Sequence, residues 1–243
     1  MSPAGIWRRN LARKRRTERI DISFLVTLNL VCCRMEKMTA ILFADLSGYS
    51  ATTEAHGAVM AADIIDQYLN IIAASLVDDA RLHERTGDEV MIIATAPDAL
   101  AQTAIRLRKR TLSIPNFLQL HGGLHHGPLL MRNNGFFGHA INLASRIAKN
   151  APSGSFHCSH DFYVALSAES RKVFQPAGQC TFKNMDAPVE IYKMAEHEHG
   201  LYTDPVCKML IDSSAIPHPT DPEIYFCSKG CLEVFFRRNN VEG

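Results

Sequence analysis

The sequence predicts an α+β fold, in which a mostly antiparallel sheet carries helices on one face and a small Cys-containing module follows at the C-terminus. Three observations favour this class. Short apolar runs typical of buried strands alternate with segments of helical periodicity. Hairpin signals interrupt that alternation, which argues against a sheet of parallel strands only. Three of the seven cysteines, Cys207, Cys227 and Cys231, crowd the end of the chain.

The first predicted strand and helix come after an unpatterned N-terminal segment. Residues 40–44 are a short apolar run that indicates a buried strand, and a turn-prone loop follows at residues 45–48. Apolar side chains then recur at helical spacing over residues 58–77. We therefore expect a strand, a loop and a long amphipathic helix in this order.

A hairpin is the next expected unit. Two strands at 81–85 and 89–94 flank the turn Thr86-Gly87-Asp88. A second helix begins at Pro97, which is a favoured residue in the first turn of a helix. The remaining expected elements are a helix over 138–149 and strands over 117–131, 155–158, 178–184 and 188–194.

The composition is that of an ordinary globular protein. The 243 residues are 47% hydrophobic and 21% charged, which excludes a disordered chain and allows a medium domain plus a small one. Lys and Arg number 26 against 25 Asp and Glu, so we expect no nucleic-acid partner. No apolar run approaches the roughly 18 residues of a membrane-spanning helix. The cysteines are not spaced as a disulfide framework, which favours reduced thiols and a cytoplasmic location.

Residues 1–37 are interpreted as an N-terminal extension. Seven basic side chains lie between residues 8 and 19, and an apolar stretch follows over residues 22–33. The order resembles a secretory signal, but no small-residue cleavage site follows. A disordered tail or an early start codon explains the segment best. Contact with a membrane surface is the alternative, and nucleic-acid binding is a weaker one.

Four short motifs gather chemically useful side chains in predicted turns and at helix starts. Asp45 ends the first strand, Asp88 lies in the hairpin turn, and Asn142 and Arg146 lie four residues apart on one helical face. Each motif alone is weak, because a turn Asp or an exposed polar helix face is common. The motifs are residues 43–49, 87–89, 123–127 and 138–146.

Together, in this order and spacing, the motifs resemble the class III nucleotide cyclase catalytic domain over residues 38–195. The resemblance implies a ferredoxin-like α+β domain over residues 38–197. It also implies a phosphorus–oxygen lyase that converts ATP to cyclic AMP and pyrophosphate in intracellular signalling. In that family the active sites lie between two subunits, so we expect a head-to-tail homodimer. His125, in the third motif, matches a structural histidine.

The resemblance assigns a role to each matched residue. Asp45 and Asp88 match the two carboxylates that hold two Mg²⁺ or Mn²⁺ ions per active site, where the ions assist the attack of the ribose 3′ oxygen on the α-phosphorus. Asn142 matches the residue that orients the ribose, and Arg146 the residue that steadies charge on the phosphates. Lys183 falls where the family often has a phosphate-contacting lysine.

A group of backbone amides is a further candidate for nucleotide binding. The backbone N–H groups of Leu46, Ser47, Gly48 and Tyr49 precede the first helix and can hold phosphate oxygens there.

The two positions that read the purine in the resembled family do not agree on one base here. Glu84 is typical of guanylate cyclases, because a carboxylate accepts hydrogen bonds from guanine, whereas adenylate cyclases have Lys there. Gly135 stands at the second position and has no side chain. We expect ATP as the substrate, with GTP as the alternative. A degenerate domain that binds a nucleotide or senses a metal without catalysis is the third hypothesis.

Residues 198–243 carry a second resemblance, to the YHS domain, through residues 204–209, 224–231 and 235–236. The resemblance places Cys207, Cys227 and Cys231 around Zn²⁺ or Cu⁺, which are soft enough for thiolates. Lys208 stands in place of the motif's usual Gly. No fourth ligand is evident, and His218 is no more than a candidate. A small hydrophobic cap with buried cysteines is the alternative, and about 40 residues need a metal or a docking surface to be stable.

Overall fold

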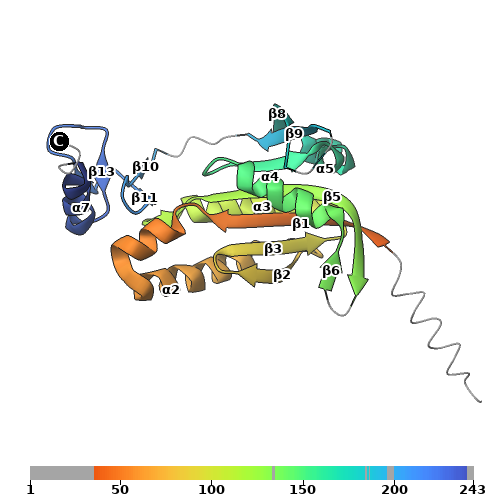
Figure 1. Cartoon of the computed structure of the whole chain (residues 1–243), viewed down its shortest axis with the longest axis horizontal. Helices are drawn as coiled ribbons and strands as arrows, with labels where there is room; N and C mark the ends of the chain where they lie inside the picture. Colours follow the sequence, from red (N-terminus) through yellow and green to blue (C-terminus); the bar gives the residue numbers. More distant parts are fainter. Residues whose placement is uncertain (1–35, 133–134, 184, 186, 196–199, 240–243) are drawn as a thin grey trace, which may run out of the picture.

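The computed structural model describes residues 36–132, 135–183, 185, 187–195 and 200–239, so the predicted extension lies outside the described residues except for Glu36 and Lys37. Its centre is an eight-stranded sheet in the order β2-β3-β1-β5-β7-β9-β8, and β6 pairs with β5 (Figure 1). Strands β5 and β7 pair in parallel, and the other pairs of this sheet are antiparallel. The prediction of an α+β fold with an antiparallel-rich sheet is confirmed.

The elements of the main domain occupy the following residues. They are β1 (Glu36–Leu46), α2 (Tyr49–Ser75), β2 (Arg81–Thr86), β3 (Glu89–Ala94), α3 (Pro97–Leu112), β4 (Phe117–Leu118), β5 (Leu120–Arg132), β6 (Gly135–Phe137), α4 (His139–Asn150), β7 (Phe156–Ser159), α5 (His160–Ala165), α6 (Ala168–Arg171), β8 (Phe174–Cys180) and β9 (Val189–Met194). The C-terminal module, residues 200–239, contains β10 (Tyr202–Thr203), β11 (Met209–Ile211), β12 (Ile216–Pro217), β13 (Tyr225–Phe226) and α7 (Lys229–Asn239).

Helices cover both faces of the sheet, because β1 is buried on both sides. Its side chains alternate: Leu42 packs with the apolar faces of α2 and α3, whereas Ile41 and Phe43 pack with Ala140 and Ala144 of α4. The expectation of helices on one face is therefore correct for α2 and α3 and wrong for α4. The short side chains of α4 allow it to approach β5 so closely that a Cβ on Gly123 would lie 2.2 Å from the backbone of Ala148.

Helix α2 begins earlier than its periodicity predicts. It starts at Tyr49 rather than at residue 58, and it changes direction at Gly57, whose φ of 84° lies in the left-handed region. Residues 49–56, before the break, are mostly polar, and only Tyr49 and Ala55 pack against the apolar core. The buried side chain of Thr52 is covered by the C-terminal module through a hydrogen bond to the Cys207 carbonyl.

The C-terminal module is built into the main domain rather than tethered to it. Strand β4 of the main domain is the edge strand of a second sheet, of order β10-β11-β4, in which Leu118 pairs with Met209. Val206 and Phe226 of the module belong to the same apolar cluster as Leu42. This shared core supplies the docking surface that such a short module needs.

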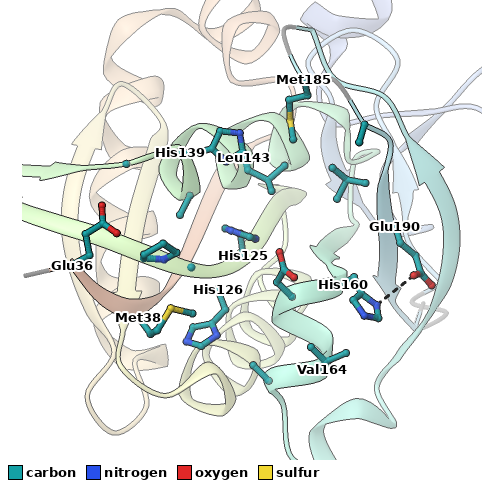
Figure 2. A pocket seen from close by; sticks show the side chains of 18 of the residues that line it. Glu36, Met38, His125, His126, His139, Leu143, His160, Val164, Met185 and Glu190 are labelled. Atoms are coloured by element: carbon teal, nitrogen blue, oxygen red, sulfur yellow. Dashed lines mark ion pairs between the residues drawn. The ribbon is translucent and has the colours of Figure 1, made fainter.

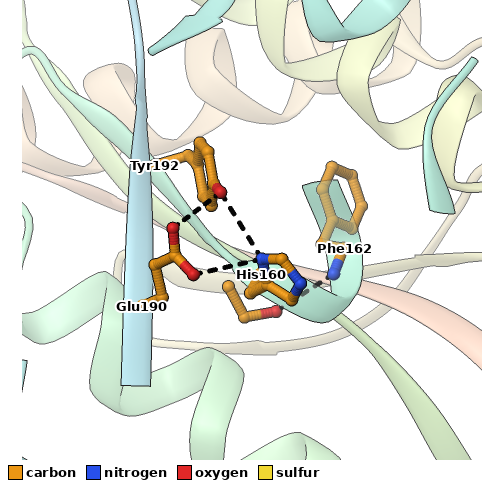
Figure 3. Close-up of polar contacts among 5 residues, drawn as sticks. His160, Phe162, Glu190 and Tyr192 are labelled. Atoms are coloured by element: carbon orange, nitrogen blue, oxygen red, sulfur yellow. Dashed lines mark hydrogen bonds and ion pairs between the residues drawn. The ribbon is translucent and has the colours of Figure 1, made fainter. Parts of the chain in front are cut away.

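The second half of the sheet shows smaller differences from the expected pattern. Strand β8 lies at Phe174–Cys180 instead of 178–184, and the short helices α5 and α6 were not expected. Polar contacts tie α5 to β9, since His160 Nδ1 lies 3.3 Å from a Glu190 oxygen and 3.4 Å from the Tyr192 hydroxyl (Figure 3). Among the described helices, none is long and apolar enough to cross a membrane.

Candidate active site

The two predicted metal-binding aspartates meet at one end of the sheet. Asp45 is the penultimate residue of β1, and Asp88 lies in the two-residue turn between β2 and β3, where Gly87 adopts a φ of 66°. Because β1 and β3 are antiparallel and Ala44 pairs with Val90, the end of β1 lies beside the turn that carries Asp88. The pairing of strands therefore brings together two carboxylates that are distant in sequence.

The surroundings of Asp45 disfavour its negative charge. Burial, the neighbouring Asp88 carboxylate and the charge of Glu89 raise the pKa of Asp45 to about 7, while a hydrogen bond from the Leu46 amide opposes the shift. Asp45 Oδ1 is buried and has no hydrogen-bond partner among the described residues. A buried carboxylate oxygen without a donor, facing a second carboxylate, is a suitable ligand for a hard divalent cation.

His121 is a neighbour of this pair that sequence reasoning missed. It lies opposite Asp45 in the β1–β5 register, and its Nε2 is 3.8 Å from Asp45 Oδ2. Its Nδ1 lies 2.9 Å from the Ser47 hydroxyl, and burial lowers the pKa of the imidazole. His121 therefore connects the carboxylate to the following loop. The cross-strand pairing was the missing signal, because Asp45 and its partner His121 are 76 residues apart in the sequence.

The loop after Asp45 is only partly free to hold a phosphate. The Leu46 amide faces the Asp45 carboxylate, and the Ser47 amide donates to the Gln119 carbonyl at 2.8 Å. Gly48 has a φ of 91°, which glycine adopts without strain. A Cβ on Gly48 would also lie 2.3 Å from the Cβ of Lys208, so the C-terminal module leaves room only for glycine there.

The two predicted base-reading positions line one pocket of about 430 Å³. Glu84 of β2 and Gly135 of β6 both contribute to it. Phe43 and Met91 form apolar walls, and Phe136 lies edge-on to His83 with ring centroids 4.7 Å apart. A smaller cavity lined by Glu84, Thr86 and Glu89 continues toward the Asp88 turn. Aromatic and apolar walls with one carboxylate suit a planar heterocycle with hydrogen-bond donors.

Three other predicted residues remain apart from the carboxylates in a single chain. Asn142 is exposed and Arg146 is half-buried on the face of α4 opposite to Leu143 and Ala144, which pack inward. Lys183 is exposed on the loop between β8 and β9, at the far edge of the sheet. Within the described part of the chain, none of the three has a hydrogen bond or ion pair with Asp45 or Asp88.

Known structures of nucleotide cyclases share this arrangement of elements. An adenylate cyclase from Trypanosoma brucei, described in its monomeric state, aligns with a TM-score of 0.61 and 20% identity, over 65% of this chain and 88% of that one. The guanylate cyclase domain of RhGC from Catenaria anguillulae, in complex with GTP, aligns with a TM-score of 0.53 and 18% identity, over 67% and 98%. The chain has the nucleotide cyclase fold.

Sequence comparison points the same way. An uncharacterized protein of Mycobacterium tuberculosis is 29% identical over 168 residues, which are 67% of this chain and 42% of that protein. An adenylate cyclase of Glutamicibacter nicotianae is 30% identical over 117 residues, covering 48% of this chain and 29% of the relative. The cyclase-like chain thus spans about two fifths or less of these curated relatives. No family model matches it.

The cysteines of the C-terminal module lie together, and a histidine of the cyclase-fold domain joins them. Cys227 Sγ lies 3.5 Å from Cys207 Sγ and 3.6 Å from Cys231 Sγ. His56 Nε2, on α2, lies 3.4 Å from Cys227 Sγ and 3.6 Å from Cys231 Sγ. A hydrogen bond from the Cys207 thiol lowers the pKa of Cys227 to about 6.

The expected fourth ligand, His218, has another role. Its Nδ1 accepts hydrogen bonds from the amides of Thr220 and Asp221, and its ring packs against Phe235 and Phe236. His218 is thus a structural residue of the loop between β12 and β13. Lys208 has a φ of 68°, which explains why the resembled motif usually has glycine at this position.

A cavity of about 890 Å³ in the cyclase-fold domain lies elsewhere (Figure 2). It opens between α4, α5 and the start of β9, and His126, His160 and Met185 contribute to its lining. None of the predicted site residues lines it. His125 at its floor is buried and contacts the Ser159 hydroxyl at 2.7 Å, as expected for a structural histidine.

Proposed function

We propose that this protein is a nucleotide cyclase that converts ATP to cyclic AMP and pyrophosphate. The observation that carries the proposal is the buried, partnerless oxygen of Asp45 facing Asp88 at the end of β1, in a domain of nucleotide cyclase fold. In the reaction the ribose 3′ oxygen loses its proton and forms a bond to the α-phosphorus. The bond from the α-phosphorus to the bridging oxygen breaks, and pyrophosphate leaves.

Asp45 and Asp88 are the residues that would hold the divalent cations, Mg²⁺ or Mn²⁺. Such ions supply Lewis-acid stabilisation of phosphate charge and ease the loss of the 3′ proton. The two carboxylates fit them because both are oxygen ligands and because Asp45 Oδ1 has no competing donor. His121 Nε2 lies 3.8 Å from the other oxygen of Asp45, so its ring borders that carboxylate.

The remaining groups would bind and orient the nucleotide. The amides of Gly48 and Tyr49 lie at the start of α2, where a helix N-terminus attracts phosphate oxygens. Asn142 would orient the ribose and Arg146 would counter the charge of the leaving pyrophosphate. Both side chains face away from the sheet of their own chain, so we propose that they act in the site of a second copy, in a homodimer.

ATP is the proposed substrate because the named relatives include adenylate cyclases. GTP is the second candidate, and the position of Glu84 in the pocket favours it. A carboxylate there can accept hydrogen bonds from the donors of guanine, whereas Gly135 contributes shape alone. We further propose a cytoplasmic location and a signalling role for the product.

The test is product formation by the full chain, given ATP and GTP in parallel with Mg²⁺ or Mn²⁺ and analysed by mass spectrometry. Cyclic AMP that disappears in the Asp45→Asn variant supports the proposal. The matched control is Asp66→Asn, which changes an exposed carboxylate of α2 and should keep wild-type activity. Cyclic GMP as the only product would replace ATP by GTP. No product from a folded dimer with either ion would overturn catalysis and favour a nucleotide-binding role.

A further inference from the structure

The group of His56, Cys207, Cys227 and Cys231 plays no part in the cyclase chemistry. Three ligands come from the C-terminal module and one from helix α2 of the cyclase-fold domain. We propose that a zinc ion binds these four side chains and thereby fastens the C-terminal module to the first turns of α2. The proposal does not depend on the catalytic assignment.

Four of the six distances among the ligand atoms are close to those of a tetrahedron around zinc. With Zn–S bonds of about 2.3 Å and Zn–N bonds of about 2.05 Å, a tetrahedron requires S···S distances of about 3.8 Å and S···N distances of about 3.6 Å. The S···S distances from Cys227 are 3.5 and 3.6 Å. The S···N distances to His56 are 3.4 and 3.6 Å, and all four atoms lie within 4.8 Å of one another.

The chemistry of the ligands favours zinc over the alternatives. Three thiolates and one imidazole form a closed four-coordinate set typical of structural zinc, and the imidazole is a poorer ligand for Cu⁺ than a thiolate is. A disulfide needs an S–S bond of about 2.05 Å, well below the 3.5 Å between Cys207 and Cys227. A disulfide between Cys207 and Cys227 would also leave Cys231 and His56 without a role.

A second set of contacts holds the ligands in position. The buried carboxylate of Asp204 accepts hydrogen bonds from the amides of Cys207, at 3.2 Å, and of Cys227, at 2.8 Å. The Ser228 hydroxyl accepts from the Cys231 amide at 3.2 Å at the start of α7. These hydrogen bonds therefore fix the backbone of the two segments that carry Cys207 and residues 227–231. Such outer contacts commonly orient metal ligands.

The position of His56 decides what the zinc ion would join. His56 precedes Gly57, where α2 changes direction, so it belongs to the short segment that follows the loop after Asp45. In the same segment Thr52 donates a hydrogen bond to Cys207. Zinc bound here would tie the first two turns of α2 to the module, next to Gly48 and its contact with Lys208.

The experiment measures zinc in the purified full chain and its competition with a chromophoric chelator. We expect one zinc ion per chain and at least about a tenfold weaker affinity in His56→Ala, the scale expected for losing a ligand or its support. Cys227→Ser should lose the ion more completely. The matched controls are His139→Ala and Cys180→Ser, which change residues outside the cluster and should bind zinc as the wild type does.

Two further measurements keep the test decisive if His56→Ala folds poorly. His56→Cys restores a fourth ligand and should retain the ion. With Co²⁺ as the probe, the wild type should show the intense visible bands of a tetrahedral thiolate site. Chelation should speed amide hydrogen exchange in residues 49–56 and 200–239 together. Zinc binding unchanged in His56→Ala, or a wild-type chain that takes up no zinc, would overturn the proposal.

Discussion

The Thr52 hydroxyl donates a hydrogen bond of 2.6 Å to the Cys207 carbonyl, although 155 residues separate the two. Thr52 is fully buried between the first turns of α2 and the C-terminal module. Its contact shows that the start of α2 and the module form one packed unit. The same unit contains Gly48, three residues after Asp45, and so lies directly beside the candidate active site.

Removal of that hydrogen bond should lower the stability of the whole chain. Thr52→Val keeps the shape of the side chain but leaves the buried Cys207 carbonyl without its donor, which costs about 1–3 kcal/mol. Thr52→Ser retains the hydroxyl, so its free energy of unfolding should decrease less. Chemical denaturation of the zinc-loaded protein measures both. Equal stability of the Val and Ser variants would mean that the hydroxyl contributes nothing.

Asp45→Asn should abolish catalysis and at the same time stabilise the metal-free protein. Activity should fall by at least about a hundredfold, because a carboxylate that would hold the divalent cations is lost. Burial and Asp88 raise the pKa of Asp45 to about 7, so its ionisation destabilises the fold increasingly as the pH rises from about 4 to 7. Asparagine removes that cost.

Thermal denaturation without divalent ions, at pH 7.5 and at pH 5, measures the second effect. The melting temperature of Asp45→Asn should exceed that of the wild type at pH 7.5, and the difference should shrink at pH 5. Asp66→Asn, an exposed change on α2, should shift neither temperature. A lower melting temperature for Asp45→Asn at pH 7.5 would contradict the electrostatic account of Asp45.

Glu84 should influence the choice of purine. Glu84→Lys replaces an acceptor by a donor in the pocket that Gly135 also lines, so kcat/KM for GTP should fall by about tenfold relative to that for ATP. Steady-state rates with both nucleotides give the ratio. A neighbouring change, Arg85→Gln, should leave the ratio alone. If Glu84→Lys also leaves it unchanged, Glu84 does not contact the base.

Two inactive variants should restore activity to each other if the sites lie between subunits. Asp45→Asn and Arg146→Ala damage opposite halves of the proposed interface. After mixing and exchange of subunits, half of the dimers are mixed and each keeps one intact site of two, so roughly a quarter of the wild-type rate should return. Mixing Asp45→Asn with Asp88→Asn serves as the control and should restore nothing. Failure of the first mixture would place all catalytic groups in one chain.

His125 should make the fold sensitive to acid. Burial lowers the pKa of His125 to about 4, below its ordinary value. Between the two pKa values His125 is protonated in the unfolded chain and neutral in the folded one. His125 therefore costs the fold nothing above about pH 6.5, and the free energy of unfolding decreases as the pH falls toward 4. Between pH 7.5 and 5 this one group should cost about 2 kcal/mol.

Urea denaturation at the two pH values measures that loss. In His125→Gln the difference between pH 7.5 and 5 should be smaller by about the same amount, whatever the overall stability of the variant. The exposed His139→Gln should keep the wild-type difference. An unchanged pH dependence in His125→Gln would show that other histidines carry the acid sensitivity.

The regular elements and the carboxylate pair were predictable because their signals are local. The apolar run before Asp45, the hairpin around Asp88 and the stripe of α4 each lie within a few residues. Strand pairing then places the two aspartates side by side without further information. Helix α4 was assigned to the wrong face because periodicity shows which side of a helix is apolar but not which sheet face it covers.

The start of α2 and the proximity of His56 to the cysteines could not be predicted from local patterns. Residues 49–57 are mostly polar by sequence, and the module that covers Thr52 comes from the far end of the chain. His56 is an ordinary polar helix residue by sequence, and 171 residues separate it from Cys227. His218 was the nearer candidate but already accepts two backbone hydrogen bonds. Proximity in sequence favoured His218, whereas the fold brings His56 to the cysteines.

The pairing of Leu118 with Met209 bears on how the chain is made. At synthesis rates of 5–20 residues per second, roughly five to twenty seconds pass between the two residues. During this interval β4 presents an unpaired edge, and Phe117 and Leu118 lack their cover. Nascent chains with such edges are the ones that chaperones hold and that aggregate when crowded. A premature stop codon within the module would therefore release an aggregation-prone polypeptide rather than a shorter folded protein.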